Sequence, residues 1–265
     1  MYKSSPTIHA FLTVRMKSSR LKKKALLKLG KLTILDRAVI NLSASKYIND
    51  VIILTSTNKD DNPIIDLCKK RNLKFFRGSE DDVLDRFLRA ARVNKTDIIV
   101  RATGDNPFVS FEIANFLIKS HLDKNADFTG IIRDNIPGGV STEIISSQAL
   151  ERLLVQDLDF SLSEYMTYYF INNPDFFNLN ILEPPNDFVL KKSKIRLTID
   201  YKEDYELAKI IIKAIKPENR CIELNKILSF FKANVKLFEK NQNLPVKWEA
   251  NLKLKNKLKK ATRII

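Results

Sequence analysis

Over its first half, the chain alternates short apolar runs rich in β-branched residues with segments whose apolar residues recur at helical spacing. The predicted strands are residues 8–14, 51–54, 74–77 and 97–102, and a helical pattern separates each from the next. Strands that alternate with helices of about 10 to 15 residues build right-handed crossover units with parallel strands. The sequence therefore predicts an α/β domain around a mostly parallel sheet.

The pattern loosens in the middle of the chain and becomes regular again towards the C-terminus. The further predictions are strands at 127–132, 142–145, 177–182 and 195–199 and helices at 147–154, 162–172, 205–215 and 224–233. The mixed middle part indicates antiparallel pairs or an inserted arm. We predict one domain over residues 1–240, with an insertion at roughly 127–184. A basic C-terminal tail at 241–265 follows, as a short helix or an extended arm.

Positive charge is concentrated in two segments. The chain has a net charge of +15, and the stretch from Arg15 to Lys31 holds eight basic residues and no acidic one. The stretch from Lys236 to Ile265 holds nine basic and two acidic residues. A nucleic-acid-binding surface usually spreads its charge over a face or a recognition helix. A nucleic-acid partner is therefore not expected, and the charge of the early loop calls for a local explanation, unless it only reflects a composition rich in Lys, Asn and Ile.

Composition excludes several classes of protein. Hydrophobic residues make up 44% of the chain and are spread along it, which excludes wholly disordered and fibrous chains. No apolar run approaches the ~18 residues of a membrane span, and no charged start with an apolar run marks a secretory signal. Cys68 and Cys221 form no pair motif. We expect a cytoplasmic protein in which both cysteines are buried thiols.

Several catalytic chemistries lack the residues that they need. His9 and His121 are the only histidines, and neither has an evident partner for a nucleophile–histidine pair. Clustered His and Cys ligands for zinc are missing from the sequence. The loop after the first predicted strand has no glycine before Gly30, which excludes a Walker loop and a dinucleotide fingerprint.

Charged side chains follow three predicted strands. Arg15, Arg20 and Lys24 follow the first, Asp105 follows the strand at 97–102, and Asp200 ends the strand at 195–199. Ligands of open α/β sheets bind at the carboxyl ends of strands. Taken singly, a solvated basic loop, a Gly-Asp-Asn-Pro turn and a helix N-cap also explain these residues. Taken together, they predict a Mg²⁺ site beside a nucleoside triphosphate.

Four ordered blocks carry a resemblance to a known family. They are residues 14–24 (VRMKSSRLKKK), 76–86 (FRGSEDDVLDR), 100–107 (VRATGDNP) and 196–204 (RLTIDYKED). With these blocks the chain resembles, from about residue 8 to 233, the spore-coat polysaccharide type cytidylyltransferases, relatives of the CMP-Kdo and CMP-sialic acid synthetases. The resemblance implies a Rossmann-like nucleotide-diphospho-sugar transferase fold, and transfer of CMP from CTP to an acidic nonulosonate-type or related sugar. It also implies pyrophosphate release, Mg²⁺, and a homodimer formed through residues 127–184.

The resemblance also implies a role for each matched residue. Catalysis would rest on Arg15, Lys24, Asp105 and Asp200, and the last two would be the metal ligands. Nucleotide binding is implied for Arg15, Ser19, Arg20, Lys24, Arg77, Gly78, Ser79, Arg101, Gly104 and Asp105. Acceptor binding is implied for Glu143, Glu164 and Thr167, whereas Asp85 and Arg86 would be structural.

The chain departs from the family pattern in the opening loop. Lys17, Lys22 and Lys23 stand where the family usually has Gly, Pro and Gly, and Tyr165 and Ser141 replace a family His and Asp. Two alternatives therefore stay open. One is nucleotidyl transfer to a sugar 1-phosphate or polyol phosphate, and the other is a non-catalytic paralogue that binds a nucleotide or polyanion.

Overall fold

A seven-stranded sheet forms the centre of the molecule. The computed structural model describes residues 5–18, 20–190, 195–238, 241, 244 and 252–264. The strand order is β5-β4-β1-β6-β8-β7-β9. The strands are β1 (Ile8–Thr13), β4 (Asp50–Ser56), β5 (Lys74–Gly78), β6 (Ile98–Thr103), β7 (Phe128–Ile131), β8 (Glu143–Ser146) and β9 (Leu179–Leu182). The β2–β3 pair (Lys28–Leu29 and Leu32–Thr33) lies apart from this sheet.

Strand direction changes between the two halves of the sheet. β1 is parallel to both β4 and β6, and β4 is parallel to β5. β8 is antiparallel to β6 and to β7, and β9 is parallel to β7. The mostly parallel α/β sheet is confirmed, and so are antiparallel pairs within residues 127–184.

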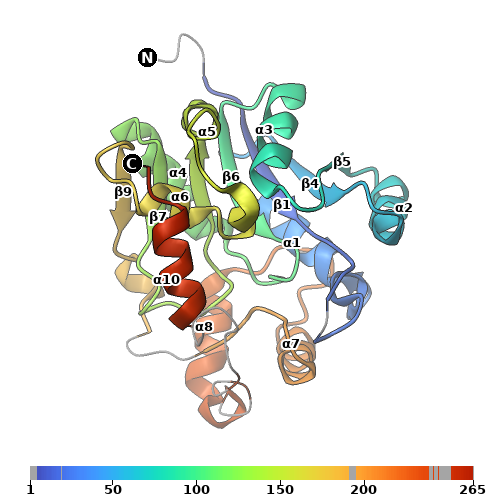
Figure 1. The fold of residues 1–265 in the computed structure, drawn as a ribbon. Coiled ribbons are helices and arrows are strands. Elements are labelled where there is room, and N and C mark those ends of the chain that lie inside the picture. Colours follow the sequence, from blue (N-terminus) through green and yellow to red (C-terminus); the bar gives the residue numbers. More distant parts are fainter. Residues whose placement is uncertain are drawn as a thin grey trace.

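Helices cover both faces of the sheet (Figure 1). They are α1 (Ile34–Ser43), α2 (Asn62–Arg71), α3 (Val83–Asn94), α4 (Phe111–Lys124), α5 (Ser147–Leu154), α6 (Thr167–Ile171), α7 (Lys202–Ile215), α8 (Leu224–Ala233) and α10 (Leu252–Ala261). Along β1, Ala10 and Leu12 pack into one core with α1, α2, α4, α7 and α8. Phe11 points to the other core, which α3, α5 and α6 cover. This alternation follows from the two-residue period of a strand.

The helices begin where the sequence supplies side chains that cap their free N–H groups. Thr33 and Asp36 form a capping box at α1. The side chains of Asp82, Ser110 and Ser146 accept hydrogen bonds from the first turns of α3, α4 and α5. Capping residues of this kind each contribute about 1 kcal/mol, so the helix starts follow directly from the local sequence.

One predicted strand is wrong. Residues 195–199 form no strand, and only an isolated bridge joins Arg196 to Gly138. Their backbone bonds with residues 138 and 105 instead of lying in the sheet: the N–H of Gly138 donates to Ile195, and the N–H of Leu197 to Gly138. The local sequence does not distinguish a sheet strand from this irregular segment, because both arrangements bury the apolar side chains.

The two cysteines differ in burial. Cys68 is buried on α2, as predicted, whereas Cys221 is half-buried, which corrects the prediction that both thiols are buried. Cys221 lies in the irregular segment between α7 and α8. Within the described part of the chain, no helix combines the length and apolar character that crossing a bilayer demands.

The basic C-terminal segment contains a packed helix. Leu258 of α10 is fully buried, and α10 contacts the 3-10 helix η3 (Phe160–Tyr165). The side-chain amides of Asn172 and Asn173 both donate to Thr262, at 2.7 Å. Figure 1 shows α10, in red, crossing in front of α6 and β7. The C-terminal segment thus supports the part of the chain that carries η3 and α6.

Replacing Leu258 with Ala tests this packing. We expect the variant to lose about 2 to 3 kcal/mol of unfolding free energy, because a buried Leu→Ala change removes apolar contacts and leaves a cavity. Denaturant unfolding measures the loss. Val93→Ala is the matched control, since Val93 on α3 is 71% exposed. Equal stability of the two variants would show that α10 does not pack in solution.

Candidate active site

A cavity of about 790 Å³ opens at the carboxyl ends of β1 and β6. Thr13, Val14 and Arg15 line it from the end of β1, and Thr103 and Asp105 line it from the end of β6. The β6–β8–β7 half of the sheet supplies a second wall, with residues that include Arg101, Gly130, Arg133 and Glu143, and α3 and the η3–α6 segment add further lining residues. The cavity therefore lies where an open α/β sheet places its ligands.

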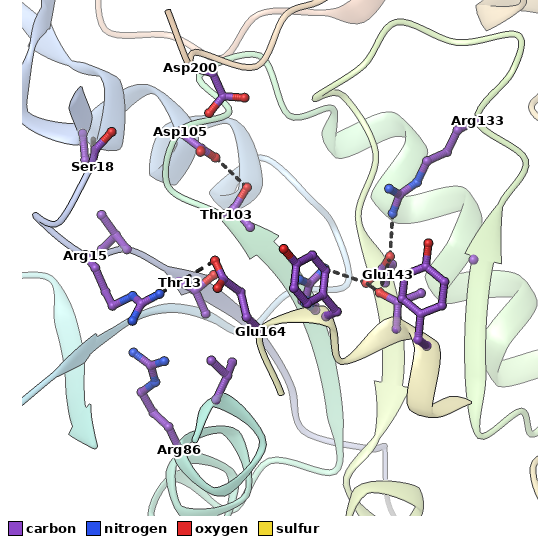
Figure 2. A pocket seen from close by; sticks show the side chains of 18 of the residues that line it. Thr13, Arg15, Ser18, Arg86, Thr103, Asp105, Arg133, Glu143, Glu164 and Asp200 are labelled. Carbon is purple, nitrogen blue, oxygen red and sulfur yellow. Dashed lines mark hydrogen bonds and ion pairs between the residues drawn. The ribbon is translucent and has the colours of Figure 1, made fainter. Parts of the chain in front are cut away.

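The two predicted metal ligands meet at one lysine. The ammonium of Lys24 donates to Asp105 Oδ2 at 2.6 Å and to Asp200 Oδ1 at 2.8 Å. The guanidinium of Arg20 donates to the same Asp200 oxygen at 2.7 Å and lies over the Tyr201 ring. Figure 2 shows Asp105 and Asp200 side by side at one end of the cavity. Residues far apart in the chain thus converge at one end of the cavity.

Backbone contacts fix the two aspartates. The N–H of Ile199 donates to the carbonyl of Asp105 at 3.0 Å, which ties their segments together. Gly104 makes the approach to β1 possible, because a Cβ there would lie 2.9 Å from the Cβ of Val14. Gly139, at φ +94°, packs so closely on residues 197 and 198 that a Cβ would lie 2.6 Å from the Thr198 nitrogen. Both glycines therefore allow the close backbone packing that holds the Asp105 and Asp200 carboxylates in place.

Charge at this end of the cavity is balanced by close pairing. Burial alone would lower the pKa of Lys24, but Asp105 and Asp200 outweigh burial and raise it above its ordinary value. Burial alone would raise the pKa of Asp200, but Lys24 and Arg20 outweigh burial and lower it. The Lys24 ammonium and the Asp200 carboxylate thus stay charged near neutral pH.

The lysine-rich loop keeps a backbone shape that glycine would favour. Lys23 stands where the family usually has Gly, and its φ of 53° is left-handed. A non-glycine residue in this region costs on the order of 1 kcal/mol. Despite this cost, Lys23 adopts the left-handed turn that leads into Lys24 at the start of η1 (Lys24–Leu26). Ser19, a predicted nucleotide-binding residue of this loop, lies outside the described residues.

A second polar cluster lies on the β8 side of the cavity. Glu143, 3% exposed, accepts from Arg101 at 2.7 Å, from Arg133 at 2.5 Å and from the Thr167 hydroxyl at 2.8 Å. Burial would raise the pKa of Glu143, but the two arginines outweigh burial and lower it. Two guanidinium groups share one carboxylate, so this wall keeps a net positive charge.

Glu164 lies apart from the other two predicted acceptor residues. Its carboxylate is 3.8 Å from Arg15 Nη2, and its side chain is 69% exposed. The neighbouring Ser163 fixes the position of Glu164. The Ser163 hydroxyl accepts from the N–H of Val83 and donates to the carbonyl of Asp81. These contacts dock η3 onto the start of α3, on the Arg15 side of the cavity.

Four predicted nucleotide-binding residues among those described do not line the cavity. The Arg77 guanidinium is occupied by the carbonyls of Ser56 and Asn58 and by Asn62. Gly78 is a packing site, since a Cβ would lie 2.8 Å from Cγ of Arg86. The Ser79 hydroxyl accepts from the N–H of Asp82 just before α3. Gly104, as described above, lets its segment pack closely against Val14 because it has no Cβ. Within the block at 76–86, these residues therefore make contacts that support the local fold.

Arg86 does line the cavity, although the sequence indicated a structural role for it. Its residue exposure is 1%, and Nε and Nη1 have no hydrogen-bond partner among the described residues. Burial, with a contribution from Arg15, lowers its pKa to about 10. No local pattern marks a buried arginine as unpaired, so only the tertiary structure could identify it.

The histidines lie away from the cavity lining. Nδ1 of His9 lies 2.7 Å from the Thr96 hydroxyl, and Nδ1 of His121 lies 2.9 Å from that of Thr129. Burial lowers the pKa of His121 to about 4. Both imidazoles are thus held by threonines within the fold.

Comparison with known proteins gives a consistent result. A family model described as cytidylyltransferase matches residues 10–244. The chain is 37% identical over 237 residues to an uncharacterized protein of Methanocaldococcus jannaschii, covering 89% of this chain and 95% of that protein. It is 34% identical over 222 residues to the spore coat polysaccharide biosynthesis protein SpsF of Bacillus subtilis, covering 81% and 91%.

Solved structures share the architecture. A cytidylyltransferase from Leptospira borgpetersenii superposes with a TM-score of 0.78 at 29% identity, covering 91% of this chain and 98% of that one. A CMP:2-keto-3-deoxy-manno-octonic acid synthetase in complex with CTP gives a TM-score of 0.61 at 12% identity, covering 79% and 99%. At 12% identity, the similarity to the synthetase shows a shared fold.

Proposed function

Because this chain belongs to the cytidylyltransferase family, we propose that it transfers CMP from CTP to an acidic sugar and releases pyrophosphate. An oxygen of the sugar attacks the α-phosphorus of CTP, and the bond to the β-phosphate oxygen breaks. The CTP-dependent nucleotidyl transfer is the activity of the family. The acidic acceptor and the use of the product in surface polysaccharide synthesis are our proposal, which the likeness to SpsF supports.

The contact of Lys24 with both Asp105 and Asp200 carries this proposal. Transfer of a nucleotidyl group needs positioning and charge neutralisation more than covalent work by the protein. In the proposed complex, Arg15, Arg20 and Lys24 bind the phosphates and offset the charge that grows on the leaving pyrophosphate. The carboxylates of Asp105 and Asp200 hold the cation.

The donor set fits a divalent metal. Both carboxylates contact the same ammonium nitrogen, at 2.6 and 2.8 Å, so their oxygens lie close enough to share one cation. Oxygen ligands from one or two carboxylates, completed by substrate phosphates, are typical of Mg²⁺. When bound there, Mg²⁺ would neutralise charge at the α-phosphate and lower the pKa of the attacking hydroxyl.

The cluster around Glu143 supports an anionic acceptor. Arg133 is held by Glu143, yet 55% of its side chain remains exposed. A guanidinium held this way offers its remaining N–H groups to a carboxylate in a forked geometry. A sugar phosphate satisfies the same donors, so acceptor chemistry has to be tested directly.

We also propose a homodimer through residues 127–184. Ile171, Phe176 and Ile181 are exposed apolar residues of this segment, at 37, 38 and 47%. Ile181 lies on β9, which ends the strand order of the sheet. A sheet edge that pairs with no further strand among the described residues and carries apolar side chains is suited to pairing with a second copy. Sedimentation of the full chain would show the oligomeric state.

A pyrophosphate-release assay tests the proposed reaction. The full chain is incubated with Mg²⁺, each of the four nucleoside triphosphates, and neutral, carboxylated or phosphorylated sugars. We expect release only with CTP and a carboxylated sugar, and loss of release with EDTA. Release with phosphorylated sugars alone would replace our proposal by transfer to a sugar phosphate. CTP binding with no release under any condition would indicate a non-catalytic paralogue.

A further inference from the structure

Arg86 combines deep burial with missing partners. It lies in the first turn of α3, and its stem packs against Gly78, as the 2.8 Å approach to Cγ shows. The residue is 1% exposed, lines the cavity, and leaves Nε and Nη1 without a hydrogen bond among the described residues. Buried charges are normally paired, because leaving one unpaired costs stability. A ligand is the partner that this geometry lacks.

The surroundings of Arg86 mix donors and acceptors. Figure 2 shows its guanidinium pointing from α3 towards Arg15, with Glu164 near the far side of Arg15. Arg15 donates to the carbonyl of Glu80 at 3.1 Å and lies 3.8 Å from the Glu164 carboxylate. Val83 adds an apolar side chain to the same wall. This wall therefore suits a flat, neutral ring with donors and acceptors on its edge.

We propose that Arg86 recognises the cytosine ring of the bound nucleotide by donating to its O2 and N3 acceptors. This inference rests on the proposed function and assigns the base selectivity of that site. Adjacent acceptors on a planar edge match the planar fork of a guanidinium. Uracil carries a hydrogen on N3, which would face the same donors. The carboxylate of Glu164 would accept from the exocyclic amine of cytosine and repel O4 of uracil.

A phosphate fits this position less well than a base. Of the three cations assigned to the phosphates, Arg20 and Lys24 are gathered around Asp105 and Asp200 at the other end of the cavity, whereas Arg15 lies beside Glu164. At the Arg86 end, the Glu164 carboxylate, which lines the cavity, would face phosphate oxygens with like charge. The nucleotide would therefore lie with its phosphates at Lys24 and its base at Arg86.

Binding of CMP and UMP to Arg86→Met tests the assignment. Methionine keeps the stem that packs on Gly78 and removes the charge. The two probes carry equal charge, so a difference between them reports the base. We expect the parent to prefer CMP, and the variant to bind CMP about ten- to a hundredfold more weakly, the loss typical of one charged hydrogen bond. UMP affinity should change less than about threefold. Equal weakening of both, or of neither, would overturn the proposal.

Stability provides the second measurement. Without nucleotide, Arg86→Met should melt at the same or a higher temperature than the parent, because it removes an unpaired buried charge. A lower melting temperature with unchanged CMP affinity would identify a structural arginine instead. Arg89→Met is the matched control on the same helix, with a side chain that is 61% exposed. It should leave CMP binding unchanged.

Arg86→Lys keeps the test decisive if the methionine variant does not fold. Lysine retains the charge but not the fork, so we expect the ratio of UMP to CMP dissociation constants to fall towards one. A ratio like that of the parent would overturn the role of Arg86. A parent chain that binds neither CMP nor CTP and releases no pyrophosphate would overturn the proposed function itself. Transfer activity with an unchanged base preference in both variants would overturn only this inference.

Discussion

Asp105→Asn is expected to lower the rate of pyrophosphate release by about a thousandfold at saturating CTP. The reason is that a bound divalent ion contributes several kcal/mol to the transition state, and each 1.36 kcal/mol is a factor of ten. The amide keeps the shape of the side chain but loses the charge that would hold the cation. Initial rates over a series of Mg²⁺ concentrations measure the effect.

The fold of this variant should remain intact. Lys24 keeps its contact with Asp200, at 2.8 Å, when the charge of Asp105 is removed. The circular dichroism spectrum and cooperative unfolding should therefore match those of the parent. Asp123→Asn is the matched control, because Asp123 is 58% exposed and pairs only with Lys119 on α4 among the described residues. A parent-like, Mg²⁺-dependent rate for Asp105→Asn would refute the proposed cation site.

Glu143→Gln is expected to have the largest effect on stability. Glu143 is 3% exposed and forms ion pairs with both Arg101 and Arg133. Removing one partner of a buried ion pair typically costs 3–5 kcal/mol. We expect about 3 kcal/mol, at the low end of that range, because Arg133 is more than half exposed and can recover hydration. Denaturant unfolding measures the loss, and Glu151→Gln at an exposed pair with Arg92 is the control.

The same variant should lose part of its sensitivity to acid. The two arginines hold the pKa of Glu143 below its ordinary value of 4.5. A carboxyl group with a lowered pKa stabilises the fold above its unfolded pKa, and this stability is lost as pH falls through the folded value. The parent should therefore lose more stability than Glu143→Gln as the pH falls below about 4.5. Parallel stability profiles of the two proteins below this pH would contradict the ion-pair role of Glu143.

Kinetics separate the two ends of the cavity. Glu143→Gln should raise KM for the acceptor and leave KM for CTP unchanged, because the Glu143 cluster orients Arg133 at the proposed acceptor end. Asp105→Asn should act on the rate with either substrate saturating. An increase in KM for CTP alone in Glu143→Gln would move the β8 cluster to the nucleotide side.

Local pattern determined much of the fold. Side-chain periods of two and of 3.6 residues mark strands and helices, and capping residues mark where helices begin. The runs at 51–54 and 97–102 and the helix at 147–154 were therefore predictable from nearby residues alone. The pattern failed at 195–199, where an apolar run is buried by contact with residues 138 and 105 instead of by a sheet partner.

The sequence by itself determined that cations follow β1 and that carboxylates follow later segments, because strand ends are readable locally. Only the tertiary structure decided which of them meet. Lys24 and Asp200, 176 residues apart, contact each other because Gly139 and Ile199 hold the Asp200 segment against Asp105. Tertiary packing also turned Arg77 away from the cavity and left Arg86 unpaired beside it. Long-range contacts set these outcomes, and residue spacing carries no record of them.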